Sequence, residues 1–190
     1  MTPRILLVGM MGAGKTTTGR LVARRLNWGY RDSDADVEAA TGLTVPELFD
    51  RNGEAAFRRA EAAVLEEACD DPAPSVVSVA GGAVLSRENR RLISSSGMVV
   101  WLRARPETLA ARVGDGAGRP LLGDDPAAAM VRLNAVRAPL YAEVGGIVVD
   151  VDDLPPEDVA ARILAAASQE FGGDRDWAAA PDSTAPPKAE

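Results

Sequence analysis

The sequence predicts an α/β fold, a three-layer sandwich in which a central parallel sheet of about five strands has helices on both faces. Short apolar and β-branched runs alternate along the chain with longer segments of helical periodicity. A glycine-rich phosphate loop (P-loop) joins the first such run to the first helical segment. The chain has 190 residues, enough for one domain with a sizeable core.

The first strand is expected at residues 4–8. Residues 9–17 then read Gly-Met-Met-Gly-Ala-Gly-Lys-Thr-Thr, which matches the pattern G-x-x-x-x-G-K-[ST], and a helix is expected over residues 16–27. Strand, glycine loop and helix in this order direct backbone N–H groups and a helix N-terminus at a phosphate. Lys15 is the only lysine before the C-terminal tail in a chain that otherwise uses arginine. This choice fits a loop that needs a compact ammonium beside the β- and γ-phosphates.

The loop also predicts which residues hold the nucleotide triphosphate. The residues expected to surround its phosphates are Gly12, Ala13, Gly14, Lys15, Thr16 and Thr17. The Thr16 hydroxyl is expected to ligate Mg²⁺, which prefers oxygen ligands.

The remaining elements follow in order. Strands are expected at residues 28–32, 75–79, 98–102 and 147–150, and helices from residue 34, from residue 44, and over residues 54–69, 86–93, 106–113, 126–143 and 156–171. The helix after Thr44 is predicted by a capping box with proline in the first turn. Pro139 is expected to kink or end the helix in which it lies.

Two segments lack the pattern of a regular element. Residues 114–125 contain four glycines and a proline, so we expect an irregular, mobile lid over about residues 112–125. Residues 172–190 are rich in Gly, Ala, Pro and Asp and are expected to form a disordered tail. Residues 1–171 would then form the single folded domain.

Composition excludes several classes of function. The chain has no histidine, which rules out a histidine base and histidine zinc sites, and its single cysteine cannot form an internal disulfide. A net charge of −7 argues against nonspecific nucleic-acid binding. No apolar run approaches the ~20 residues of a membrane span, and the first expected strand leaves no room for a signal peptide. We therefore expect a cytoplasmic monomer without nucleic-acid or membrane partners.

Other motifs narrow the class of P-loop protein. The N-K-x-D motif of GTPases is absent. The strand at 75–79 ends in Ala-Gly-Gly rather than in the acid that an ordinary ATPase places there, and the nearest acids at a strand end are Asp32 and Asp34. This pattern in a chain of this length is typical of a small-molecule kinase.

With these motifs in place, the chain resembles the shikimate kinase family over roughly residues 4–170. Besides the P-loop, five segments match family patterns in the right order: residues 32–34 (D-[ST]-D), 53–61 (G-E-x-x-F-R-x-x-E), 80–84 (G-G-G-x-V), 119–122 (R-P-L-L) and 137–141 (R-x-P-x-Y). Ala80 departs from the pattern by replacing the first of three glycines, which we expect to be tolerated. Residues 152–156 also lack the basic residue that often precedes a proline in the family's adenine-contacting segment.

The resemblance implies roles for the two aspartates. Asp34 is expected to bind the attacking hydroxyl and accept its proton, and a carboxylate is the natural base in a chain without histidine. Asp32 is expected to serve Mg²⁺, directly or through another ligand. The structural alternative for either residue is a helix N-cap, and for Asp34 also a solvated charge.

The resemblance also implies a substrate-binding set. Arg58 and Arg137 are expected to hold the substrate carboxylate through bidentate hydrogen bonds. A surface pair between Arg58 and Glu61, three residues apart on a helix, is the alternative for Arg58. Gly81 and Gly82 are expected to let a ligand approach the backbone closely, and a plain turn is their alternative.

Two further arginines belong to the expected nucleotide site. Arg119, within the lid, is expected to neutralise charge on the transferring phosphoryl group, with a solvated loop charge as the alternative. Arg112 is expected to stack near adenine. Trp28 and Trp101 are expected in the core rather than at a ligand.

The resemblance implies an ATP- and Mg²⁺-dependent kinase that phosphorylates the 3-hydroxyl of shikimate in the pathway to chorismate and aromatic amino acids. Two alternatives remain open from the residues. One is a P-loop kinase for another small polyol or a nucleoside monophosphate. The other is a nucleotide-binding regulator without turnover.

Overall fold

The computed structural model describes residues 2–114, 116, 119–123 and 125–172. These residues form a five-stranded parallel sheet in the order β2-β3-β1-β4-β5. The strands are β1 (Arg4–Val8), β2 (Gly29–Asp32), β3 (Ser75–Ser78), β4 (Met98–Arg103) and β5 (Ile147–Asp150). The predicted fold class and all five predicted strands are therefore confirmed.

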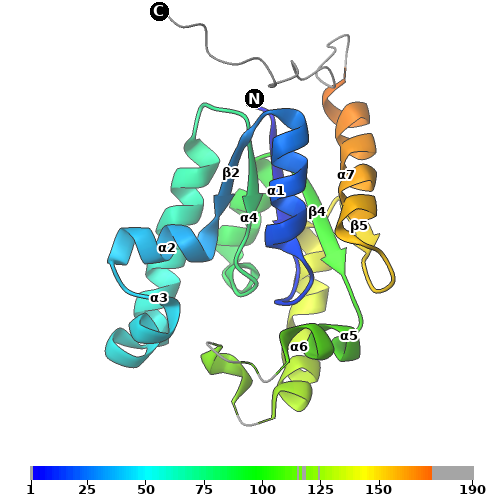
Figure 1. Cartoon of the computed structure of the whole chain (residues 1–190). Coiled ribbons are helices and arrows are strands. Elements are labelled where there is room, and N and C mark those ends of the chain that lie inside the picture. The colour runs from blue at the N-terminus through cyan, green and yellow to red at the C-terminus, as the bar shows by residue number, and fades with distance from the viewer. Residues whose placement is uncertain (1, 115, 117–118, 124, 173–190) are drawn as a thin grey trace, which may run out of the picture.

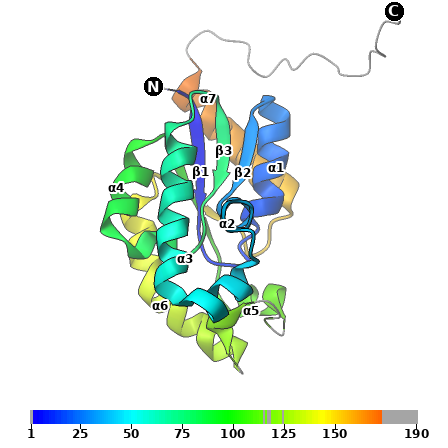
Figure 2. The same ribbon diagram turned by 90° about the vertical axis from the view of Figure 1, so that its left-hand side faces the viewer.

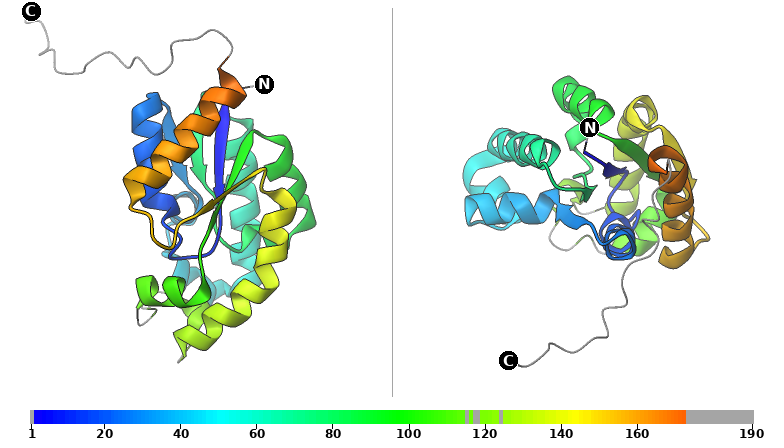
Figure 3. Two further views of the ribbon diagram at one scale, coloured as in Figure 1. Left: turned by 90° about the vertical axis from the view of Figure 1, so that its right-hand side faces the viewer. Right: turned by 90° about the horizontal axis from the view of Figure 1, so that it is seen from above.

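Helices connect the strands and cover both faces of the sheet. They are α1 (Lys15–Leu26), α2 (Ser33–Thr41), α3 (Val45–Asp70), α4 (Arg87–Ser95), α5 (Pro106–Val113), α6 (Pro126–Val144) and α7 (Pro156–Phe171), with 3₁₀ turns η1 (Ala83–Leu85) and η2 (Pro120–Leu122). Helices α1 and α7 lie on one face, and α3, α4 and α6 lie on the other (Figure 3). Figure 2 shows α3 beside α4.

The strands all run in one direction, so their carboxyl ends meet at one edge of the sheet. In Figure 1 this edge is at the lower end of the molecule, where α5 and η2 also lie. In open parallel sheets, ligands bind beyond the carboxyl ends of the strands. The loops at this edge are therefore the place to look for a site.

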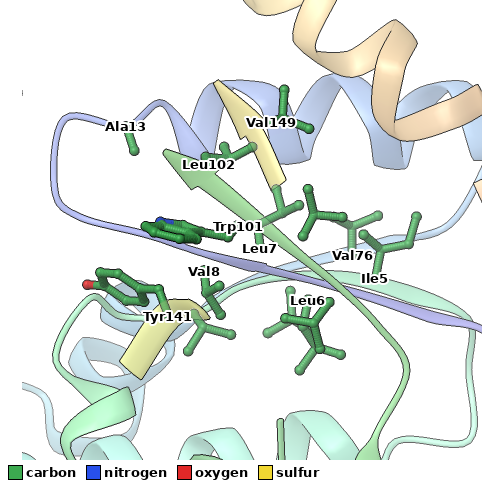
Figure 4. Packing of buried hydrophobic residues seen from close by; sticks show 14 of the residues in the cluster. Ile5, Leu6, Leu7, Val8, Ala13, Val76, Trp101, Leu102, Tyr141 and Val149 are labelled. Carbon is green, nitrogen blue, oxygen red and sulfur yellow. The ribbon is translucent and has the colours of Figure 1, made fainter. Parts of the chain in front are cut away.

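The central strand β1 is the centre of the core, and all five of its side chains are buried. Aromatic rings complete the core on the side of α6, where Trp101 and Tyr141 pack with ring centroids 5.9 Å apart (Figure 4). Trp28 packs against Phe171 at 5.7 Å, which ties α1 to α7. The core position predicted for Trp101 is confirmed, and Trp28 is partly buried and packs against the core.

The structure differs from the sequence-based expectations at three points. The helices expected from residues 44 and 54 form one element, α3, interrupted only by Gly53 at φ 78°. Pro139 does not end α6, which continues to Val144 because residues on both sides of the proline are buried against the core. The expected lid contains the 3₁₀ turn η2, held by Leu122, whose side chain is 1% exposed.

The segments expected to form the lid and the tail lie partly or almost wholly outside the described residues. The residues outside are 115, 117–118 and 124 in the lid and residues 173–190 in the tail. In the part of the chain that is described, no helix combines the length and apolar character that crossing a membrane requires.

Candidate active site

A pocket of about 540 Å³ opens beyond the carboxyl ends of the strands. It is lined by nearly every residue that the sequence singled out: Gly12, Gly14, Lys15, Thr16, Thr17, Asp32, Asp34, Arg58, Gly81, Gly82, Arg112, Arg119 and Arg137. Ala13 is the exception. Its side chain is 3% exposed and packs into the core, so only its backbone can face a phosphate.

The P-loop leads from β1 into α1. Gly12 and Gly14 adopt φ 80° and φ 88°, a backbone conformation that glycine adopts without strain. Gly14 is the N-cap of α1 and provides no side-chain hydrogen bond to the helix N-terminus. The first N–H groups of α1 are thus available to an anion.

The Lys15 ammonium lies over this loop and donates hydrogen bonds to the carbonyl oxygens of Gly9 (2.8 Å) and Met10 (3.1 Å). Burial lowers the pKa of Lys15 to about 8, although the charges of Asp34 and Asp32 act in the opposite direction. A phosphate bound in the loop would favour the charged form further.

Asp32, at the end of β2, has two functions at once. Its Oδ1 accepts a hydrogen bond from the Asp34 backbone N–H (3.3 Å), which makes it the N-cap of α2. Its Oδ2 accepts a hydrogen bond from the Thr16 hydroxyl (2.8 Å). The capping alternative is therefore correct, and the same carboxylate also contacts the predicted magnesium ligand.

Asp34 lies in the first turn of α2, with its side chain open to solvent inside the pocket. The surrounding protein raises its pKa through desolvation, and the Lys15 charge opposes this shift. Asp32 adds a smaller upward effect. A carboxylate whose pKa is raised is a better proton acceptor than an ordinary surface aspartate.

Arg58 projects from α3 into the other end of the pocket. Its Nη1 donates to both carboxylate oxygens of Glu61 at 3.0 Å, and its Nη2 donates to Glu54 at 3.0 Å. The predicted i,i+3 pair therefore exists, but it is not a surface pair, because Glu61 is 1% exposed. Burial raises the pKa of Glu61 to about 6, against the opposing charge of Arg58.

The two glycines after β3 fit closely against the arginines. A Cβ on Gly82 would overlap the Arg58 guanidinium, at 2.7 Å from its Cζ. Gly82 has φ −93°, which suits any residue, so glycine here makes room for the guanidinium rather than for a special backbone conformation. A Cβ on Gly81 would lie 3.7 Å from Arg137 Nη1 and 3.3 Å from the Tyr141 hydroxyl.

Arg137 comes from α6 and is 3% exposed. Among the described residues, no carboxylate lies within the 4 Å of an ion pair with it. The neighbouring Tyr141 hydroxyl donates to the Gly81 carbonyl at 2.6 Å. A buried guanidinium on the pocket wall, without a carboxylate at ion-pair distance in the described residues, is suited to an anionic ligand.

Two arginines of the segment expected to form the lid also line the pocket. Arg119 precedes η2 and lines the pocket with an exposed side chain. Arg112, in the last turn of α5, donates to the carbonyl oxygens of Val151 (2.6 Å) and Asp152 (3.1 Å). Arg112 thus contacts the backbone at the start of the segment 152–156.

Sequence reasoning did not identify two polar residues beside Asp32. The Tyr30 hydroxyl lies 2.9 Å from Asp32 Oδ2 and 2.9 Å from the Ser78 hydroxyl oxygen. The signal available in the sequence was the spacing of Tyr30 and Asp32, since residues two apart on a strand share a face. Ser78 gave no such signal, because its position depends on the pairing of β2 with β3.

The arrangement brings together a phosphate site, a carboxylate that can accept a proton and a pair of arginines. Comparisons with known proteins agree with it. The family model described as Shikimate kinase matches residues 11–168. A shikimate kinase from Pseudomonas syringae pv. tomato is 42% identical over 162 residues, which are 85% of this chain and 94% of that protein. One from Bordetella pertussis is 46% identical over 152 residues, 80% of this chain and 72% of that protein.

A solved structure gives the same result. The shikimate kinase from Acinetobacter baumannii in complex with shikimate superposes with a TM-score of 0.86 at 36% identity, covering 91% of this chain and 97% of that chain. Fold, site and comparisons all lead to the same assignment: this chain belongs to the shikimate kinase family.

Proposed function

We propose that this protein transfers the γ-phosphoryl group of ATP to the 3-hydroxyl of shikimate, giving shikimate 3-phosphate and ADP. The observation that supports this most strongly is the Arg137 guanidinium, which is buried in the same pocket as the P-loop and has no carboxylate within ion-pair distance in the described part of the chain. A phosphoryl acceptor that carries a carboxylate would supply an anionic partner for this guanidinium. A neutral polyol would leave it buried without an anion.

In this proposal Arg58 and Arg137 bind the substrate carboxylate. Guanidinium groups suit a carboxylate because their planar N–H donors match its two oxygens. Glu61 holds Arg58 in place through two hydrogen bonds of 3.0 Å, and Gly82 leaves room for the guanidinium. Gly81 and Gly82 form the backbone wall against which the substrate ring lies.

Asp34 orients the 3-hydroxyl and takes its proton as the oxygen attacks. The oxygen–phosphorus bond forms at the γ-phosphorus while the bond to the β-γ bridging oxygen breaks, and ADP leaves with that electron pair. Lys15 and the N–H groups at the start of α1 stabilise charge on the phosphates. Arg119 approaches the transferring group from the lid, residues 112–125, whose closure excludes water.

The residues present fit a magnesium ion. Thr16 and Asp32 provide a hydroxyl and a carboxylate 2.8 Å apart beside the P-loop, and Mg²⁺ is usually held by one or two protein oxygens together with substrate phosphates. The described residues contain no group of three or more His, Cys, Asp or Glu side chains that could hold a metal ion. When bound, Mg²⁺ would neutralise phosphate charge.

An assay of ADP release with and without shikimate tests the function. ADP release should depend on shikimate, phosphorus NMR should identify the 3-phosphate, and Lys15→Met should abolish turnover while the circular dichroism spectrum stays unchanged. Other polyols and nucleoside monophosphates serve as alternative acceptors. Turnover with one of these instead of shikimate, or no turnover at all, would contradict the proposal.

We further propose that residues 1–171 act as a cytoplasmic monomer, with ATP and shikimate as the only partners. Sedimentation of the active enzyme tests the monomer, and fractionation of cells tests the location. Arg112 is proposed to contact the adenine ring. The KM for ATP of the Arg112→Ala variant would test this contact.

A further inference from the structure

Hydrogen bonds connect Ser78 and Tyr30 to Asp32, a residue of the predicted magnesium site. Tyr30 and Asp32 are two residues apart on β2, so their side chains share one face of the strand. The register of β2 with β3 places Ser78 opposite Asp32. The Tyr30 hydroxyl lies between them, 2.9 Å from Asp32 Oδ2 and 2.9 Å from Ser78 Oγ.

The chemistry of these groups decides the direction of the hydrogen bonds. A carboxylate only accepts, whereas each hydroxyl has one proton to donate. Tyr30 therefore donates to Asp32, and Ser78 donates to the Tyr30 oxygen. Thr16 donates to the same Oδ2 at 2.8 Å, which leaves the lone pairs of its hydroxyl oxygen for a cation.

Packing holds the tyrosine ring independently of its hydroxyl. The ring lies under α1, where a Cβ on Gly19 would be 2.7 Å from Tyr30 Cε2 and 3.0 Å from Ser78 Oγ. The Arg20 guanidinium carbon lies 5.6 Å from the centre of the ring. Glycine inside a helix is destabilising, and here it provides the space that the ring occupies. A phenylalanine at position 30 fits the same space.

We propose that Tyr30 is a positioning residue of the magnesium site. Its hydroxyl accepts a hydrogen bond from Ser78 and donates one to Asp32, and so holds the Asp32 carboxylate in one orientation. In that orientation Asp32 accepts the Thr16 proton, which leaves the lone pairs of the Thr16 oxygen facing the cation. The inference depends on the proposed function, because it assumes that Thr16 and Asp32 serve Mg²⁺. It adds to that function a hydroxyl outside the P-loop that sets the affinity for the metal.

The test measures metal binding directly. Mn²⁺ replaces Mg²⁺, and the free ion is followed by electron paramagnetic resonance during titration of the enzyme–ADP complex. Tyr30→Phe should weaken Mn²⁺ binding about 10-fold, the low end of the effect of removing a group that orients a metal ligand. The affinity for ADP without metal should stay unchanged, because Tyr30 does not line the pocket.

Two further variants separate positioning from a loss of stability. Ser96→Ala removes a buried hydroxyl at the amino end of β4, where it donates to the Leu92 carbonyl at 2.6 Å, and should leave Mn²⁺ binding unchanged. Ser78→Ala should weaken Mn²⁺ binding in the wild type but add little in the Tyr30→Phe background. A similar loss in Ser96→Ala, or losses that simply add, would overturn the inference.

The outcomes also distinguish this inference from the proposed function. If Asp32→Ala weakens Mn²⁺ binding while Tyr30→Phe stays within about twofold of wild type, the inference fails and the magnesium site stands. If the wild-type enzyme–ADP complex binds no Mn²⁺, the site itself is wrong and the inference fails with it.

Discussion

The most direct prediction concerns Arg137, the buried arginine on the pocket wall. Arg137→Lys retains the charge but removes the two-pronged geometry that a carboxylate requires. Arg137 is 3% exposed, so a carboxylate bound there would be shielded from water. Disrupting one side of such a pair costs ~2–5 kcal/mol, and a change that keeps the charge belongs at the low end. A loss of ~2 kcal/mol weakens shikimate binding roughly 30-fold.

Isothermal titration of shikimate into the enzyme measures this loss, and a coupled assay gives the KM values for both substrates. The KM for ATP should stay near the wild-type value, because in the proposed function the ATP phosphates contact the P-loop, Lys15 and Arg119 rather than Arg137. The matched control is Arg132→Lys. Arg132 lies on the same helix with an exposed side chain, so its replacement should change neither substrate constant.

A modified substrate provides the decisive comparison. A shikimate analogue with a neutral amide in place of the carboxylate should bind the wild type poorly. Its binding to Arg137→Lys should be only slightly weaker than its binding to the wild type, because the analogue already lacks the interaction that the substitution removes. The coupling energy between the substitution and the change of substrate should therefore be ~2 kcal/mol. If the losses from the variant and the analogue add instead, Arg137 does not hold the carboxylate and the proposed orientation of the substrate is wrong.

Four further predictions follow from the same site. Gly82→Ala should displace the Arg58 guanidinium and raise the KM for shikimate roughly 10-fold, with little change in melting temperature because its φ is −93°; an unchanged KM would contradict the close fit. Asp34→Asn should lower kcat by ~10² or more, and a change in KM alone would make Asp34 a binding residue only. The profile of kcat/KM against pH should rise as Asp34, whose pKa is raised, loses its proton and fall as Lys15, with a pKa of about 8, loses its own; a profile without a fall between about pH 7 and pH 9 would contradict the role of Lys15, and one without an acidic limb would contradict the role of Asp34. Truncation after Phe171 should leave activity and melting temperature nearly unchanged, and a loss of several degrees would show that the tail contacts the domain.

The fold was predictable because its signals are local. Four of the five strands, at residues 4–8, 75–79, 98–102 and 147–150, are short runs rich in apolar residues that needed no knowledge of the rest of the chain. The strand at 28–32 is not such a run, and none of the residues of β2 is fully buried. Helix ends with capping residues were equally clear: Thr44 and Glu47 form the predicted capping box. Of the two effects expected of Pro139, the structure excludes the end of the helix, because tertiary burial of the neighbouring residues outweighs the cost of proline and α6 continues.

The site was predictable to the extent that motifs encode it. The P-loop is a contiguous sequence, and the family patterns identified the arginines of α3 and α6. Contacts between elements were not accessible in the same way. That Gly82 faces Arg58, and that Gly19 makes room for the ring of Tyr30, follows only from how the helices lie on the sheet. No spacing within one element reveals such contacts.

Asp32 shows why the structural and the functional explanations of a residue need not compete. An N-cap requires one carboxylate oxygen, here Oδ1, which accepts the Asp34 N–H. The other oxygen, Oδ2, remains for Thr16 and Tyr30. The cap anchors Oδ1 at the start of α2, and the Tyr30 hydroxyl is proposed to set the direction in which Oδ2 points. The helix that Asp32 caps therefore helps to order the proposed metal site and positions Asp34, two residues later, where the substrate hydroxyl is proposed to react.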